Sequence, residues 1–425
     1  MIDLDGSNEL QEVLPQGQKI VNKHNTMAVL LDKTQRFVHP ITNIPFLKAV
    51  LLFLLVTYLS LGSVTGSARA EDSEILRKDT FVAGNVTQIA AARSRHNFAV
   101  TAVRDSDGNL RVISWRVRCG TPITRRDTEV AGAVSEIALT QARDGFVVTA
   151  VRDSDGNLRV ISWEVEPNGT ITRRDTEVAG AVSEIAVAQR LDPFSPLDTF
   201  IVTAVRDSDG DLRVISWSVS NTGNLTRRDT EVAGAVTTID VAGYNKGVVT
   251  GVRDSANNLR LISWEVANNG GITRRDTETA GMVSAIAMDS AHPRTAADPS
   301  IVVTALRDNN NNLRVISWSV SDTGNIIRRD TEVAGIVSNI DTAQIRLGDG
   351  PIKDRFVTAV RDSNADLRII GWSVDTANAD LERLGTAVAG TISNVAVAKV
   401  SNSCAITAVR DDNNNLRIIS WSVTN

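Results

Sequence analysis

The chain has 425 residues, of which 42% are hydrophobic and 22% are charged, and its formal net charge is -5. This composition is that of a globular protein and excludes disorder over most of the length. The slightly acidic balance gives no reason to expect a nucleic acid or an anionic membrane surface as partner, because both attract clustered positive charge.

The first feature along the chain is a short apolar run, AVLLFLLVTYLSL, at Ala49–Leu61. A small-residue stretch follows it and ends in the sequence ARA at residues 68–70. An apolar run of this length before an A-x-A site is typical of a secretory signal. We therefore predict a targeting segment over residues 1–70, cleavage before Glu71, and export to the periplasm, the cell surface or the medium. An uncleaved signal that anchors the chain in the membrane is the alternative.

Residues 71–425 repeat one pattern seven times, and each copy carries one tryptophan at a fixed place. The tryptophans are 47 to 54 residues apart, a period typical of propellers and helical arrays. Each copy divides into four runs rich in Val, Ile and Thr, bounded by Gly, Asn, Asp and Pro, without an apolar stripe at helical spacing. The sequence therefore predicts an all-β, seven-bladed β-propeller with four antiparallel strands per blade. The seven are Trp115, Trp163, Trp217, Trp264, Trp318, Trp372 and Trp421.

The two ends of the array predict how it closes. The repeated region begins with ILRKDT at Ile75–Thr80, which is a fourth-strand sequence that stands before any first strand. It ends with NLRIISWSVTN, a third strand with no fourth strand after it. We expect the N-terminal strand to complete the last blade, because closure of this kind removes the exposed ends of a repeat array.

The layout of one copy resembles that of WD-repeat propellers. A small-residue strand, a D-x-D-G turn, an L-R-x-x-x-W strand, a T-G turn and a V-S-E-I-A strand follow one another, and the resemblance covers roughly residues 75–425. The sequence departs from that family where Glu164 follows Trp163, in place of Asp, and where Ala179 and Gly180 stand in place of Gly-His. The resemblance implies the architecture and says little about function, because propellers carry many unrelated activities.

The turn DSDGN raises the question of a metal site, because closely spaced carboxylates suit a hard cation. Other copies read DSANN, DNNNN, DSNAD and DDNNN, so the inner Asp and the Gly are replaced freely. Asn tolerates the positive φ that Gly156 adopts easily. We therefore interpret this segment as a turn, and we predict no metal and no cofactor.

Charged residues flank that turn in every copy. Arg152 and Asp153 precede it and Arg159 follows it, and Arg206 and Arg213 are their counterparts in the next copy. One interpretation is a ring of salt bridges that connects neighbouring hairpins. The other is a ring of guanidinium groups that binds an anionic ligand, because the planar fork matches a carboxylate or a sulfate.

The repeated tryptophans allow two interpretations. Together with the arginines they could form repeated carbohydrate sites of the kind found in propeller lectins. Alternatively, they fill the wedge between blades, which widens outward and needs a bulky side chain. The packing role is favoured, because each copy has only this one regular aromatic residue on that strand.

The sequence offers little for catalysis. No HExxH motif, nucleophile elbow or phosphate loop is present. The histidines His24 and His39 fall in the targeting segment, and His96 and His292 fall in irregular connections. The middle residue of the first strand differs between copies and forms no coherent ring of ligands. An enzyme is therefore the third hypothesis, a lyase or hydrolase with its site in the unique loops.

The connections between the first and second strands vary most between copies. They expand at Gln189–Asp198, Asp289–Ser300 and Gln344–Arg355. Insertions on one face of a repeat array often mark its binding face. We therefore expect a binding module whose ligand is an unidentified protein or carbohydrate, with the lectin as the alternative.

The two cysteines fall in the first and last blades, which closure would make neighbours. An oxidising destination would permit a disulfide between them. However, Cys404 stands at the start of a second strand and Cys119 lies past the end of a third. This offset favours a Cα separation beyond about 7 Å and two unpaired thiols.

Overall fold

The computed structural model describes residues 75–424, except 96, 144, 192–198, 292–297 and 346–352. The described residues belong to the unit Ala70–Asn425. They form 21 antiparallel strands and no helix, which confirms the predicted all-β class. No helix with the length and apolarity of a membrane crossing occurs among them, and the predicted targeting segment lies outside this range.

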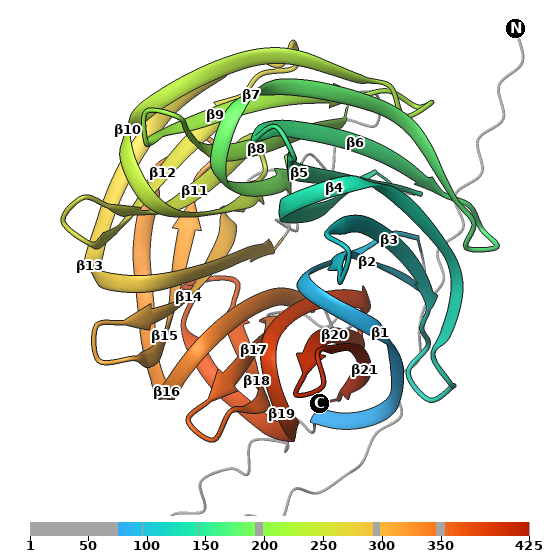
Figure 1. The fold of residues 1–425 in the computed structure, drawn as a ribbon. Helices are drawn as coiled ribbons and strands as arrows, with labels where there is room; N and C mark the ends of the chain where they lie inside the picture. The colour runs from blue at the N-terminus through green and yellow to red at the C-terminus, as the bar shows by residue number, and fades with distance from the viewer. Residues whose placement is uncertain are drawn as a thin grey trace, which may run out of the picture. The chain divides into compact units, whose positions relative to one another are not determined.

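Seven long strands alternate with seven short hairpins around a central axis (Figure 1). The long strands are β1 (Ile75–Arg93), β4 (Thr124–Arg143), β7 (Ile171–Gln189), β10 (Leu225–Tyr244), β13 (Ile272–Ala291), β16 (Ile326–Ile345) and β19 (Leu381–Ser401). The hairpins are β2 (Phe98–Asp105) with β3 (Asn109–Arg116), β5 (Phe146–Asp153) with β6 (Asn157–Val165), β8 (Thr199–Asp207) with β9 (Asp211–Val219), β11 (Gly247–Asp254) with β12 (Asn258–Val266), β14 (Ser300–Asp308) with β15 (Asn312–Val320), β17 (Lys353–Asp362) with β18 (Asp366–Asp375), and β20 (Cys404–Asp411) with β21 (Asn415–Val423).

Each long strand changes partner halfway along its length. The first half of β4 pairs with β3, and its second half pairs with β5. The change occurs at the repeated Ala-Gly, where Gly132 has a φ of 45° and the register shifts. We expected two separate short strands here. In β4 this left-handed residue bends the chain enough to reach the next hairpin without interrupting the strand.

The closure predicted from the two chain ends is confirmed. The first half of β1 pairs with β21, and its second half pairs with β2 (Figure 1). Ile75 is buried in the cluster that contains Trp421, and the ring of Phe81 packs edge-on against Trp115 with centroids 5.3 Å apart. The N-terminal strand therefore joins the last hairpin to the first through both hydrogen bonds and side-chain packing.

The turns within the hairpins follow the chemistry expected of them. Gly156 has a φ of 81°, and Asn257 and Asn311 take its place with φ of 66° and 63°. Ala365 adopts 67° at the same position in the copy DSNAD, where an L-residue with a Cβ is less favoured. The free substitution of Gly by Asn is therefore explained by backbone conformation.

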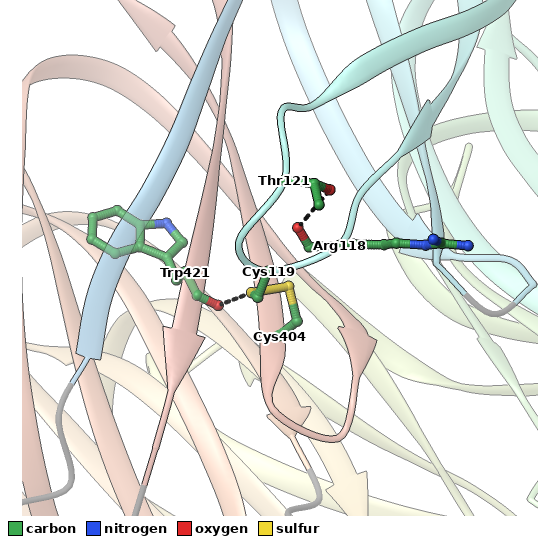
Figure 2. The surroundings of a disulfide bond; sticks show 5 residues. All are labelled: Arg118, Cys119, Thr121, Cys404 and Trp421. Carbon is green, nitrogen blue, oxygen red and sulfur yellow. Dashed lines mark hydrogen bonds between the residues drawn. A yellow bond between two sulfur atoms is a disulfide. The ribbon is translucent and has the colours of Figure 1, made fainter.

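The prediction of two unpaired cysteines was wrong. Cys119 and Cys404 form a disulfide with a Cα separation of 5.7 Å (Figure 2). Cys119 lies just after β3 and Cys404 begins β20. In antiparallel hairpins the start of one strand and the end of its partner lie at the same edge, so ring closure brings the two residues together at that edge.

Removal of this disulfide should destabilise the protein. The bond links residues 285 positions apart, and the chain-entropy model assigns a crosslink of that span about 5–6 kcal/mol. We expect Cys119→Ser/Cys404→Ser to lower the midpoint of denaturant unfolding, and treatment of the wild type with a reductant to lower it equally. Equal midpoints for the variant and the oxidised wild type would contradict this prediction.

Candidate functional site

The seven tryptophans predicted as possible ligand contacts lie in the core. Each ring is at most 1% exposed, and each indole N–H donates to a threonine hydroxyl fourteen residues earlier, at 2.9–3.1 Å. Trp163, for example, donates to Thr149 and packs against residues of the preceding hairpin, β2 and β3. A ring with both faces covered offers no surface on which a sugar can stack.

The repeated arginines next to the turn connect neighbouring repeats. Arg206 on β8 donates through Nε to the carbonyl of Val236 on β10, at 2.8 Å, and through Nη1 to Ser183 on β7. Arg152 donates in the same way to Ser135. Arg206 therefore ties its hairpin to the long strand on either side, whereas Arg152, among the described residues, bonds only to the preceding long strand, β4.

The second set of arginines pairs within its own hairpin. Arg159 bonds to Asp153 at 3.1 Å, and Arg213 bonds to its counterpart Asp207 at 2.9 Å. The other oxygen of Asp153 accepts the backbone N–H groups of Asp155 and Asn157. The expected salt bridges exist, but they do not connect neighbouring hairpins as proposed from the sequence. Every oxygen of Asp153 is occupied, so this carboxylate holds the turn.

Several residues considered for a site lie outside the described range. They include His96, His292 and most of the three long insertions. In the described residues, no group of three or more His, Cys, Asp or Glu is placed to hold a metal.

A cavity of 560 Å³ lies between the second halves of all seven long strands. It is the central channel around which the strands are arranged (Figure 1). The three long insertions connect β7 to β8, β13 to β14 and β16 to β17, so they leave the ends of channel-lining strands. The connections that differ most between copies therefore follow directly from strands that line the channel.

Carboxyl groups line this channel at positions where other copies have different residues. Glu136 lines it at the place that Gln88 has in the first copy, and Glu184 has the same place in the next copy, directly before the lining residue Ile185. Asp240 and Asp341 stand two residues further along the strand, where the other five copies have Ala. Asp289 stands two residues further again, where the other copies have Ala or Thr. Only the first of these positions was compared in the sequence, so the three aspartates were missed. A comparison of every second residue along the strand would have found them.

Each aspartate bridges its own strand to the next strand around the channel. Asp240 accepts the N–H of Met288 on β13, at 2.6 Å, as well as that of Val241. Asp289 accepts from Gln344 on β16, and Asp341 accepts from Val397 on β19, each at 2.6 Å. The carboxyls thereby satisfy N–H groups at the inner strand edge, which has no further strand to pair with.

Burial has the largest effect on the pKa of these carboxyl groups, and it raises that pKa. It raises the pKa of Asp240 to about 8, although the two backbone N–H bonds act in the opposite direction. The neighbouring carboxylates Asp341 and Asp289 raise the pKa of Asp240 further. Burial likewise raises the pKa of Asp341 and of Glu184 to about 7 each. Several channel carboxyls therefore exchange protons near neutral pH.

The channel contains fewer cations than acids among its described lining residues. Lys399 and Arg93 lie among the lining residues, and the Lys399 amine donates to Gln344. Arg152 and Arg206 lie close enough to lower the pKa of Glu136 and Glu184 respectively. Of the four arginines named from the sequence, Arg152 and Arg206 thus act on these acids, whereas Arg159 and Arg213 pair with aspartates of their own hairpins.

Comparisons with known proteins support the fold. No family model matches the chain, and no curated protein matches it. A crystal structure of a protein from Lactobacillus plantarum is similar, with a TM-score of 0.51 and 15% identity over 72% of this chain and 86% of that one. Sqt1 of Saccharomyces cerevisiae aligns with a TM-score of 0.48 and 12% identity over 83% of this chain and 100% of that one. The first likeness, together with the closed antiparallel arrangement of strands, shows a propeller-like fold.

Proposed function

We propose that this protein is an exported, seven-bladed propeller that acts as a binding module, with its ligand at the central channel. The observation that carries the proposal is the channel itself. It combines 560 Å³ of space with carboxyl groups that the repeat pattern does not require, since other copies fold with Gln or Ala at the same places. Groups that are unnecessary for the frame and gather in one cavity are candidates for binding.

The strand pairings support a count of seven blades. Each hairpin pairs on one side with the second half of a long strand and on the other with the first half of the next long strand. This gives four strands per unit. The last unit takes its fourth strand from β1.

Two features support export. The apolar run at Ala49–Leu61 and the A-x-A sequence after it form a secretory signal pattern. The disulfide between Cys119 and Cys404 suits an oxidising destination.

The chemistry of the channel favours a cationic ligand. Four carboxyls and two cations line it, and each ionised carboxylate there would gain from a positive partner in a poorly hydrated space. Sugar binding at the repeated tryptophans would need open indole faces, and the buried rings provide none. No observation favours catalysis over binding at the channel.

Binding of the linear polycation spermidine to the oxidised protein tests this proposal. We expect saturable binding with one site per chain and an affinity that increases as the pH rises from 6 to 9. Affinity should rise with pH because the pKa values of Glu184 and Asp240 are raised. Below about pH 7 both carboxyls are mostly protonated and neutral, and a cation is attracted only to their ionised forms. Isothermal titration calorimetry at each pH measures the change.

Two double variants identify the groups involved. Glu136→Gln/Glu184→Gln copies Gln88 of the first repeat, and Asp240→Ala/Asp341→Ala copies the Ala of the other repeats, so both should fold. Each should weaken binding at least about tenfold and flatten its pH dependence. Asp155→Asn, in an exposed turn, is the matched control and should bind as the wild type does. Spermidine binding that is absent, or that persists in both double variants, would exclude the channel as a cation site.

A further inference from the structure

Three arginines gather at a second cavity, away from the channel. Arg116 ends β3, Arg118 lies in the connection that follows, and Arg126 is on β4. Together with Asn97 and Asn168 they line a cavity of 320 Å³. Phe98 and Pro167 complete the described lining, so no acidic residue is among the lining residues.

The other copies show what normally occupies the place of Arg116. In the next repeat Glu164 stands there and accepts from Nε of Arg174 at 2.8 Å, and Glu265 does the same for Arg275 at 2.6 Å. Four further copies have a serine at this place, and in two of them it accepts from the arginine, as where Arg228 donates to Ser218 at 2.9 Å.

The first copy replaces this acceptor with a cation. Arg126, the counterpart of Arg174 and Arg228, therefore faces Arg116 in place of an oxygen atom. Within the described residues, no hydrogen bond or ion pair joins any of the three guanidinium groups to a protein acceptor. Three like charges around one cavity repel one another unless an anion lies between them.

The surrounding backbone fixes this arrangement. Gly169, with a φ of 97°, lies so close to Arg126 that an added Cβ would meet the Arg126 side chain at 2.6 Å and the ring of Phe98 at 2.7 Å. Ser114 donates to the carbonyl of Gly169 and holds this turn in place. The turn that carries Asn168 therefore packs directly against the stem of Arg126.

The disulfide holds the third arginine. Cys119 follows Arg118 directly and is bonded to Cys404, and the N–H of Thr121 donates to the Arg118 carbonyl at 3.0 Å. The Arg118 side chain extends away from the sulfur atoms (Figure 2). The backbone of this short connection is thus anchored next to Arg118, and the Arg118 guanidinium group lines the cavity.

We propose that Arg116, Arg118 and Arg126 form a binding site for a dianionic tetrahedral oxyanion, a phosphoryl or sulfuryl group. Guanidinium forks donate paired N–H groups to such oxygens, and the amides of Asn97 and Asn168 add neutral donors at the same cavity. Three positive charges are matched better by a dianion than by one carboxylate. The cavity is large enough for the group to be carried on a small organic molecule.

Calorimetric titration of the oxidised full chain with inorganic phosphate, inorganic sulfate and acetate, at matched ionic strength with chloride, tests the site. We expect saturable binding of phosphate or sulfate, and weaker binding of acetate. Arg116→Glu, which recreates the pair seen at Glu164 and Arg174, should abolish binding and leave the melting temperature unchanged or higher.

A pair of matched variants separates this site from general anion effects. Arg126→Gln and Arg228→Gln each remove the second arginine of the same repeated motif. The first should weaken anion binding at least about tenfold, and the second should leave it unchanged. Three results would overturn the proposal: no saturable binding of phosphate or sulfate, acetate binding as tight as either, or equal losses in the two variants. The site shares no lining residue with the channel, so its failure and that of cation binding are distinguishable.

Discussion

A chain that begins at Asn85 will lose its single cooperative unfolding transition. It lacks the first half of β1, which supplies the backbone partner of β21, and it also lacks Ile75 and Phe81. Without them the last hairpin exposes an unpaired strand edge, and the packing of Trp421 and Trp115 is opened to water. We expect a broad, early melting transition in calorimetry and association at micromolar concentration.

A chain that begins at Glu71 is the control for this deletion. It removes the predicted targeting segment but keeps all of β1, and it should melt in one sharp transition. If the chain starting at Asn85 melts at the same temperature and with the same enthalpy, β1 does not close the ring.

Substitution of Trp217 by Ala should lower the free energy of unfolding by about 3–5 kcal/mol. The ring is fully buried in a cluster with Val148, Leu158 and Val160 of the preceding hairpin, and its N–H donates to Thr203 at 3.0 Å. The change leaves a cavity between two neighbouring hairpins. Denaturant unfolding followed by circular dichroism measures the loss.

Trp217→Phe provides the comparison for this substitution. Phe keeps most of the apolar volume and loses the bond to Thr203, so a smaller loss of stability is expected. An alanine variant as stable as the wild type would show that the tryptophan does not pack as a core residue.

Much of the frame could be predicted because the copies serve as an internal comparison. The tryptophan, the turn and the unpaired strands at the two ends recur in positions that require a particular conformation or partner. Gly156 and Asn257, for example, share a positive φ, which explains why one replaces the other. The all-β class and the closure by the N-terminal strand followed from these patterns.

The disulfide was missed because the alignment compared positions within a copy. Cys119 and Cys404 occupy different positions in their copies, but antiparallel pairing brings the end of β3 and the start of β20 to one edge. Their proximity depends on the geometry of the closed ring, which spacing along the chain does not reveal.

Both candidate sites depend on departures from the repeat. Asp240 and Asp341 replace Ala in the channel, and Arg116 replaces an acceptor at the second cavity. The sequence contains these differences, but a single unusual residue does not indicate a site until the residues around it in the fold are known. Residues that agree in all copies, such as Trp217 and Arg159, hold the frame.

We infer that the repeated residues build the frame and that the residues which differ between copies bind the ligand. Spermidine affinity at pH 8.5, measured by calorimetry for Trp217→Phe and for Asp240→Ala/Asp341→Ala, tests it most directly. We expect wild-type affinity for the first variant and at least about a tenfold loss for the second. Loss of binding in the tryptophan variant, with retention in the channel variant, would contradict it.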